Sequence, residues 1–189
     1  MTVPYQAALY RPFVSDRHQK ALFLDRDGVL NVDHVDYAWK PANFTILPGV
    51  PEALKAVKAK GYKIIIVTNQ SGVAKGVYTK EDVLWCLEQI QQASDYAIDG
   101  HYMGVHHPDF TTRSFERKPD SLLFEKAIAR FQVDVGQSIM FGDKGRDLEP
   151  AAQVGIRQLI AIDNEQEGKA IRTGFAKSMP EAVERYMLD

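Results

Sequence analysis

The chain has 189 residues, of which 45% are hydrophobic and 25% charged, with a net charge of −2 and a pI near 6.2. A chain of this length can bury one sizeable core. The charge balance argues against general attraction to nucleic acid or an anionic membrane, and a single cysteine excludes a disulfide framework within the chain.

The first twenty residues combine weak hydrophobic periodicity with prolines and scattered polar residues, which predicts an extended N-terminal arm over 1–20. They lack the basic-then-apolar pattern of a secretion signal. Later apolar runs are shorter than a membrane span, so we expect a cytoplasmic protein without membrane contact. Residues 21–189 are expected to form a single domain.

Apolar runs and amphipathic segments alternate along that domain. The pattern predicts strands near 21–24, 62–68, 100–105, 138–142 and 158–162, and helices near 50–60, 79–97, 120–131, 146–154 and 180–187. Such alternation indicates an α/β fold, a doubly wound and mostly parallel sheet with helices on both faces. Cys86 falls in a predicted helix and is expected to be a packed small hydrophobe. The connections leave no room for a separate cap domain.

The first predicted strand ends abruptly at Asp25-Arg-Asp27-Gly28, which delivers two carboxylates to one strand tip. Ligands of open α/β sheets bind beyond such ends. Two acids so close together repel each other unless a cation lies between them, and a hard divalent ion such as Mg²⁺ suits oxygen ligands. These residues predict a phosphoryl-transfer site, although a solvated turn explains the four residues alone equally well.

Three later segments carry matching groups. Residues 68–71, Thr-Asn-Gln-Ser, follow the second strand and offer a hydroxyl and backbone N–H groups to phosphate. Arg117 and Lys118 place two cations before a helix. Asp143 ends the fourth strand and adds a third carboxylate. Each motif alone has a simpler explanation, as a helix cap, a solvated corner or a turn, but their joint occurrence in this order favours one site.

Together these motifs resemble those of the haloacid dehalogenase superfamily, over about residues 21–163. The resemblance implies a Rossmann-like fold and an aspartate-nucleophile phosphatase, with a phosphomutase disfavoured because no cap is predicted. Asp25 is then the nucleophile and Asp27 the general acid and base. Mg²⁺ would be bound by the carboxylates of Asp25 and Asp143 and the main-chain carbonyl of Asp27. The phosphate oxygens would be held by Thr68, Asn69 and Lys118.

The loops narrow the resemblance to the branch that contains the heptose bisphosphate and histidinol-phosphate phosphatases. Asn31-Val-Asp-His34, Leu-Pro-Gly-Val, Thr-Asn-Gln-Ser-Gly-Val-Ala, His-His-Pro and Arg-Lys-Pro carry it. It implies removal of the 7-phosphate of D-glycero-D-manno-heptose 1,7-bisphosphate, a step of lipopolysaccharide biosynthesis. Histidinol phosphate or another small sugar phosphate is the alternative substrate. A protein that binds a phosphorylated ligand without turnover is the alternative of another class. The chain is expected to be a monomer.

Polar groups of these loops are the expected substrate contacts. They are Asn31, His34, Asn69, Gln70, Ser71, Lys75, Arg117, Lys118 and Lys144. By analogy the cations would meet the phosphates and the first loop the sugar. For His34, a position on the surface of the loop is favoured over a role in catalysis.

The third loop departs from the branch. Many members bind a structural zinc there through cysteines, whose positions are taken here by Gly104, Ser114 and Glu116. A tetrahedral site needs a full set of N or S ligands, so no structural zinc is predicted. A much less favoured alternative is an improvised site of His106, His107, Asp109 and Glu116. Without zinc, the loop is expected to be ordered by packing of Phe110 and Phe115.

Overall fold

The computed structural model describes residues 18–188, so the predicted N-terminal arm lies almost wholly outside the described residues. All six strands of the sheet run parallel, in the order β3-β2-β1-β4-β5-β6. They are β1 (Ala21–Leu24), β2 (Lys63–Asn69), β3 (Gly100–Gly104), β4 (Ile139–Gly142), β5 (Gln158–Ile162) and β6 (Gly174–Ala176). The predicted doubly wound α/β fold is confirmed.

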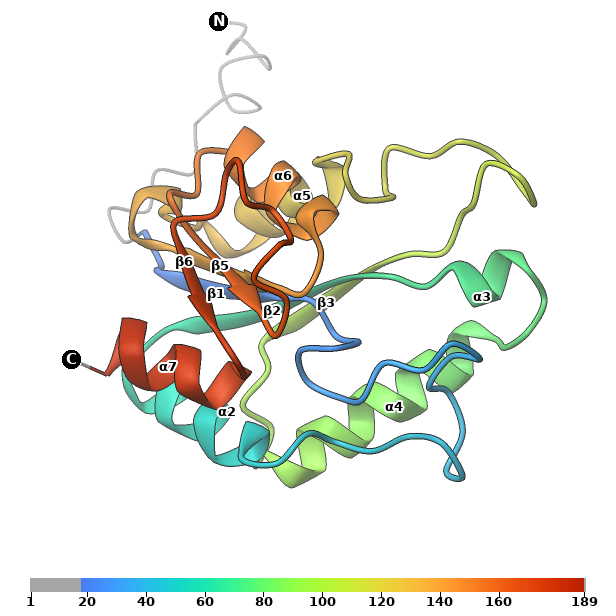
Figure 1. Cartoon of the computed structure of the whole chain (residues 1–189), viewed down its shortest axis with the longest axis horizontal. Helices are drawn as coiled ribbons and strands as arrows, with labels where there is room; N and C mark the ends of the chain where they lie inside the picture. Colours follow the sequence, from blue (N-terminus) through green and yellow to red (C-terminus); the bar gives the residue numbers. More distant parts are fainter. Residues whose placement is uncertain (1–17, 189) are drawn as a thin grey trace, which may run out of the picture.

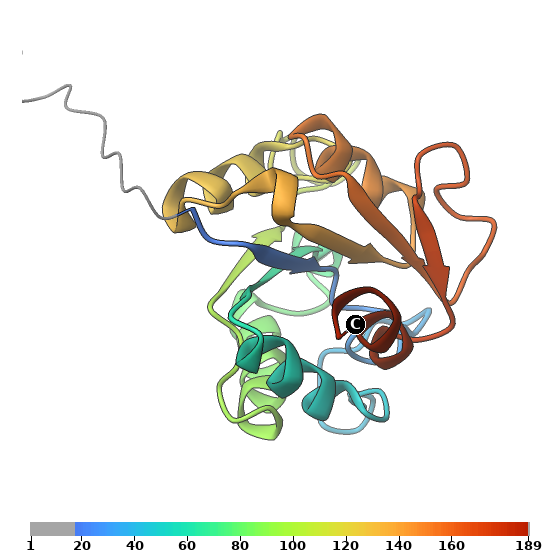
Figure 2. The same cartoon turned by 90° about the vertical axis from the view of Figure 1, so that its left-hand side faces the viewer.

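Helices cover both faces of the sheet (Figures 1 and 2). One face packs against α2 (Val50–Ala59), α4 (Lys80–Ala93) and α7 (Met179–Met187), and the other against α5 (Leu122–Phe131) and α6 (Gly145–Gln153). The helices present apolar stripes to the sheet, and every side chain of the central strand β1 is buried. Among residues 18–188, no helix combines the length and apolar character needed to cross a bilayer.

Three short elements escaped prediction: β6, the one-turn helix α3 (Ser71–Ala74) and the 3-10 helix η1 (Val135–Gln137). Each has three or four residues, too few to show a hydrophobic period. The second predicted helix is also shorter than expected. A capping box starts α4 at Thr79, and the helix ends before Asp95 and Tyr96, which both adopt positive φ.

The strand order indicates where in the sheet a ligand would bind. The chain moves from β1 outward to β2 and β3, then returns to β4 on the other side of β1, so the order reverses between β1 and β4. Ligands of open α/β sheets bind at such a switch point, outside the carboxyl ends of the strands. Asp25 follows β1 and Asp143 follows β4, so both lie beside the switch point. The buried Cys86 lies on α4, as predicted, with Sγ 3.7 Å from the Ala38 carbonyl oxygen.

Candidate active site

Three buried aspartates gather at the switch point, and two of them pair with one buried lysine. Lys118 Nζ lies 2.9 Å from Asp25 Oδ1 and 2.7 Å from Asp147 Oδ1, and it donates to the Val67 carbonyl oxygen at 2.7 Å. The carboxylates of Asp25, Asp143 and Asp147 bring ligand atoms within 4.8 Å of one another. Lys144 Nζ reaches Asp143 Oδ2 at 2.6 Å from the half-exposed side.

The electrostatics of this cluster leave room for a cation. Burial, followed by the charge of Asp25, raises the pKa of Asp143 to about 7. Burial also raises the pKa of Asp147. Burial alone would lower the pKa of Lys118, but the carboxylates of Asp147 and Asp25 outweigh it and raise that pKa. The negative charge of the buried carboxylates is thus larger than the positive charge of Lys118. A divalent cation that prefers oxygen ligands would neutralise the remaining negative charge.

Two glycines allow these carboxylates to approach the backbone. A Cβ on Gly28 would lie 2.6 Å from Asp143 Oδ2, and the residue has φ +78°, which favours glycine. A Cβ on Gly142 would lie 2.5 Å from the Cβ of Asp147. Gly28 is therefore needed both for the turn after Asp27 and for the close approach of the Asp143 carboxylate.

Metal binding and proton binding should compete at this cluster. The folded protein retains a proton on Asp143 up to about pH 7, whereas the unfolded chain releases it near 3.8. Raising the pH from about 3.8 to about 7 therefore destabilises the metal-free protein. Below about pH 7, Mg²⁺ must also displace the proton from Asp143 in order to bind. We expect the increase in Tm on adding Mg²⁺ to be larger at pH 8 than at pH 6. Asp143→Asn should remove this difference; an equal shift at both pH values in the unaltered protein would contradict it.

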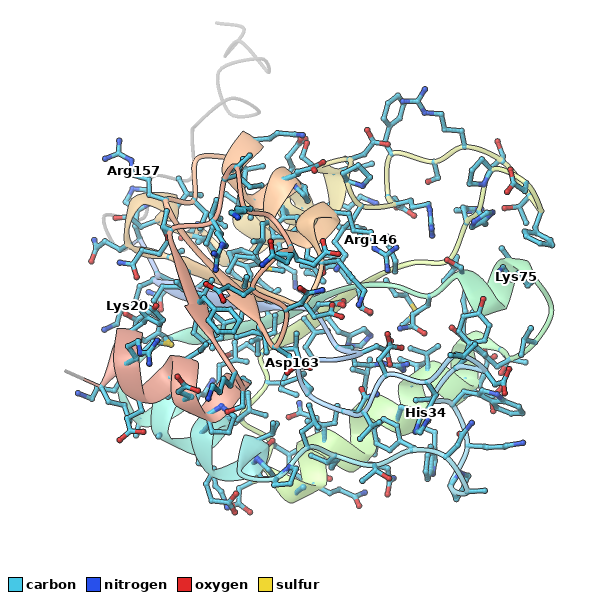
Figure 3. All side chains as sticks on the ribbon, viewed as in Figure 1. Lys20, His34, Lys75, Arg146, Arg157 and Asp163 are labelled. Atoms are coloured by element: carbon cyan, nitrogen blue, oxygen red, sulfur yellow. The ribbon has the colours of Figure 1, made fainter. Side chains whose placement is uncertain are left out.

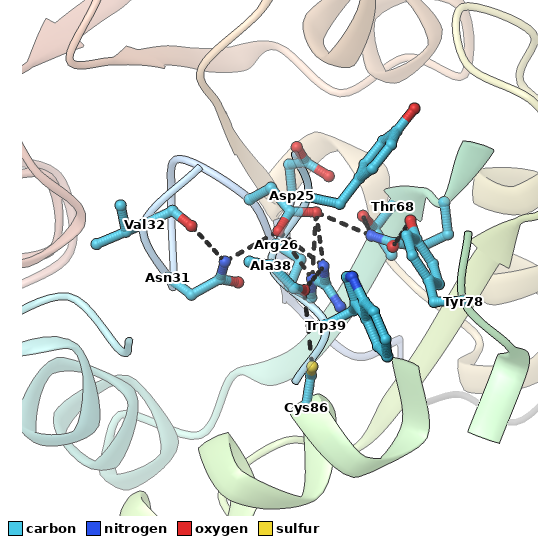
Figure 4. A network of polar contacts seen from close by, with 12 residues as sticks. Asp25, Arg26, Asn31, Val32, Ala38, Trp39, Thr68, Tyr78 and Cys86 are labelled. Atoms are coloured by element: carbon cyan, nitrogen blue, oxygen red, sulfur yellow. Dashed lines mark hydrogen bonds and ion pairs between the residues drawn. The ribbon is translucent and has the colours of Figure 1, made fainter. Parts of the chain in front are cut away.

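The second aspartate of the motif is held by a separate network. Arg26 Nη2 donates to Asp27 Oδ1 at 2.7 Å and to Oδ2 at 3.0 Å, and Asn31 Nδ2 donates to Oδ1 at 2.9 Å. Gln70 Nε2 donates to Oδ2 at 2.9 Å. Arg26 is 1% exposed and also donates to the Ala38 carbonyl oxygen (Figure 4). The Asp27 carboxylate is oriented from three sides, apart from the cluster around Lys118.

A pocket of about 260 Å³ opens onto both groups. Its residues include the four aspartates named above and the cationic side chains of Lys75, Arg117, Lys144 and Arg146, together with Asn69, Ser71, Tyr37, Tyr78 and His107. A larger hollow of about 630 Å³ shares Asp33, Asp143 and Lys144 with it, but its remaining walls are largely apolar. Because Asp25 and Asp27 line only the first pocket, that pocket is the candidate site.

The structure separates the predicted substrate contacts into two groups. Asn69, Ser71, Lys75, Arg117 and Lys144 line the pocket. The others do not: Asn31, Gln70, Thr68 and Lys118 are buried beneath it, and His34 is exposed in the first loop (Figure 3).

Hydrogen bonds from a side chain to its backbone hold the loop after β3, and the two phenylalanines expected to order it by packing make ring contacts but stay largely exposed. Phe110 and Phe115 are 56% and 66% exposed. Asn69 instead pairs with the backbone of Lys118, donating to its carbonyl oxygen and accepting from its N–H, both at 3.0 Å. Gly104, at a position where cysteine was expected from the family, lets this backbone approach, since a Cβ there would lie 2.4 Å from the Glu116 carbonyl oxygen.

The alternative zinc site of this loop is not assembled within the described part of the chain. Glu116 forms an ion pair with Lys126, and His107 lies 3.7 Å from Asp109. Between residues 18 and 188, the only three acidic, histidine or cysteine side chains that bring ligand atoms together are the buried aspartates of the site. The absence of structural zinc stays a prediction.

Arg26, Arg146 and Asp147 are charged residues of the site that were missing from the predicted set. Asp147 lies in the first turn of α6, four residues after Asp143, which precedes the N-cap of the same helix, so the two carboxylates flank the start of α6. It also accepts from the Lys144 N–H at 3.0 Å, so it reads in the sequence as an ordinary helix cap. Arg26 alternates with the two aspartates, and its burial could not be seen in the sequence.

Known proteins resemble this chain in sequence and structure. Residues 11–155 match the haloacid dehalogenase-like hydrolase family. The D-glycero-beta-D-manno-heptose-1,7-bisphosphate 7-phosphatase of Haemophilus ducreyi is 37% identical over 81% of this chain and 86% of its own length. That of Haemophilus influenzae is 35% identical over 90% and 91%. The D,D-heptose 1,7-bisphosphate phosphatase of B. bronchiseptica, solved with magnesium and phosphate, superposes with a TM-score of 0.78 at 26% identity, covering 88% of this chain and 97% of that one.

Proposed function

The chain belongs to the haloacid dehalogenase-like hydrolase family and is a phosphatase, and we propose that it removes the 7-phosphate of D-glycero-D-manno-heptose 1,7-bisphosphate with Mg²⁺ as cofactor. One observation carries the substrate class. A single pocket is lined by two aspartates suited to phosphoryl transfer and by three cations, Lys75, Arg117 and Arg146. That arrangement suits a small molecule with two phosphate groups.

The positive charges of these three side chains are not neutralised by carboxylates of the described residues. Among the residues that the structure describes, none of the three forms an ion pair with a carboxylate. Arg117 Nη1 donates to Ser71 Oγ at 2.6 Å, and Lys75 lies over the rings of Tyr37 and Phe110. Burial, and after it the charge of Arg146, lowers the pKa of Arg117. An anionic ligand would relieve this repulsion.

In the proposed mechanism Asp25 and Asp27 act in sequence. A carboxylate oxygen of Asp25 forms a bond to phosphorus while the bond to the sugar oxygen breaks, and Asp27 gives that oxygen its proton. Water then attacks the phosphorus of the aspartyl phosphate and gives a proton to Asp27. This hydrolysis releases phosphate and regenerates the Asp25 carboxylate. The buried Lys118 balances the charge of Asp25, with Nζ 2.9 Å from Asp25 Oδ1.

Mg²⁺ would be held by the carboxylates of Asp25 and Asp143 and the main-chain carbonyl of Asp27, and would neutralise charge on the transferring phosphoryl group. Asp147 joins the same acidic cluster and is the natural further partner, direct or through water. Thr68 and the Asn69 N–H complete the proposed phosphate contacts. The monomeric state and cytoplasmic location expected from the sequence remain predictions.

A substrate panel tests this proposal. Phosphate release with Mg²⁺ is measured for both anomers of the heptose 1,7-bisphosphate, histidinol phosphate and simple sugar monophosphates. We expect the highest kcat/KM with one heptose anomer. A preference for histidinol phosphate would redirect the substrate assignment but keep the chemistry. Tight binding of a phosphorylated compound without release of phosphate from any of them would contradict the proposal.

Arg146 offers a separate test of the site proposed for the second phosphate, because it is not one of the proposed phosphoryl-transfer residues. Arg146→Gln should lower kcat/KM for the bisphosphate about fivefold to tenfold, the value of one charge-assisted hydrogen bond at an exposed position, with little change for a monophosphate. Arg157→Gln is the matched control, since Arg157 is exposed at the other end of the molecule (Figure 3). Equal losses for both substrates would show that Arg146 does not contact the second phosphate.

A further inference from the structure

The side chain of Gln70 joins two groups that the proposed mechanism uses separately. Its Nε2 donates to Asp27 Oδ2 at 2.9 Å and to Thr68 Oγ1 at 3.0 Å, and its Oε1 accepts from the Tyr78 hydroxyl at 2.7 Å. Gln70 is 1% exposed, so these contacts are shielded from water. The residue expected from the sequence to bind substrate instead lies behind the residues that would do so.

The direction of each hydrogen bond follows from the chemistry of the partners. Once Asp27 has given its proton to the leaving oxygen, its carboxylate can only accept, so the amide nitrogen of Gln70 must face it. The amide oxygen then faces Tyr78, which must donate its hydroxyl proton. Since Thr68 Oγ1 accepts from Gln70, the hydroxyl hydrogen of Thr68 is left for another acceptor, such as a phosphoryl oxygen. Tyr78 therefore sets the orientation of an amide that in turn orients two side chains.

The surrounding fold holds Tyr78 firmly. Its ring is 6% exposed, stacks with Trp39 at 6.1 Å between centroids, and meets Tyr37 edge-on at 5.5 Å. Gly72 makes room for the ring, because a Cβ on Gly72 would lie 1.9 Å from Tyr78 Cε1. Figure 4 shows Tyr78 beside Thr68 at one end of the network and Trp39 packed alongside.

We propose that Gln70, held by Tyr78, is a positioning residue that aligns Asp27 and Thr68 on the same phosphoryl group. The inference rests on the proposed function, because it assumes that Asp27 protonates the leaving oxygen. Its consequence is specific: misplacing Asp27 should matter most when the leaving group needs a proton. A sugar alkoxide needs one, whereas p-nitrophenolate is stable enough to leave without it.

The test compares kcat/KM for the heptose bisphosphate and for p-nitrophenyl phosphate, because this ratio reports the steps up to the aspartyl phosphate. For Tyr78→Phe we expect a loss of about tenfold with the sugar phosphate, and for Gln70→Leu about a hundredfold, with smaller losses for the aryl ester. The ratio of the two values should fall at least about fivefold in both variants. Tyr78→Phe keeps the ring and its packing, so it remains informative if Gln70→Leu fails to fold.

Tyr186→Phe is the matched control, since within residues 18–188 the Tyr186 hydroxyl forms hydrogen bonds with the backbone of Phe175, at 3.2 Å to both N and O, away from the site. It should lower stability without changing the ratio. If Tyr78→Phe lowers both substrates equally, or behaves like Tyr186→Phe, the positioning role is overturned while the phosphatase assignment stands. An unaltered protein that turns over neither substrate would overturn the proposed function and this inference with it.

Discussion

Asp25→Asn should remove phosphatase turnover, with kcat lowered by about 10⁴-fold or more, and leave the fold intact. The amide is a poor nucleophile, so the aspartyl phosphate cannot form, and nothing else in the cluster can replace it at the tip of β1. Phosphate release from the heptose bisphosphate with Mg²⁺ measures the loss. Residual activity above about 1% of the unaltered protein would contradict the assignment of Asp25 as nucleophile.

The same substitution should have an unusual effect on stability. Asp25 contributes to the raised pKa values of Asp143 and Asp147, so removing its charge relieves repulsion among buried carboxylates. Lys118 keeps Asp147 as a partner at 2.7 Å. We therefore expect the metal-free Asp25→Asn protein to melt at or above the Tm of the metal-free unaltered protein. A marked decrease in Tm would show that the Asp25–Lys118 pair stabilises more than the repulsion costs.

Lys118→Met should lower the stability of the protein more than the other substitutions considered for the site. The ammonium group is 1% exposed and is the cation that contacts both Asp25 and Asp147. Removing one partner of a buried ion pair leaves uncompensated charge and typically costs about 3–5 kcal/mol. Loss of charge balance at the nucleophile should also lower kcat/KM by about 10³-fold. Denaturant unfolding and steady-state kinetics measure the two effects.

Lys144→Met provides the comparison for Lys118→Met. The Lys144 side chain is 37% exposed and, in the described part of the chain, forms an ion pair with Asp143 alone, so its removal should cost far less stability. Mg²⁺ should restore part of the stability lost in Lys118→Met, because it adds positive charge to the same carboxylates. Equal destabilisation by the two substitutions would contradict the central place given to Lys118.

Most residues that meet at the candidate site could be predicted because they lie at or just after the end of a strand. Asp25, Asn69 and Asp143 come directly after or at the end of apolar runs, and the parallel order brings such ends to one edge of the sheet. Lys118 was recognisable only through its motif, since nothing in its own segment indicates burial. The main strands were predictable for the same reason, because their apolar runs are long enough to stand out.

What the sequence could not reveal is which way neighbouring polar side chains turn. Asn69, Gln70 and Ser71 are consecutive and chemically alike, yet Asn69 holds a loop, Gln70 points inward to Asp27, and Ser71 meets Arg117. Their directions depend on partners from distant segments. Phe110 shows the converse, because an aromatic residue in a loop is buried only when apolar side chains cover it, and Phe110 contacts His107 and Lys75 yet stays 56% exposed.

The most direct test of the whole account is to follow both phosphorus atoms of the heptose 1,7-bisphosphate by ³¹P NMR in the presence of Mg²⁺. With the unaltered protein, the 7-phosphate signal should be replaced by that of inorganic phosphate while the 1-phosphate signal persists, and Asp25→Asn should leave both unchanged. Loss of the 1-phosphate, or release of phosphate by Asp25→Asn, would contradict the account.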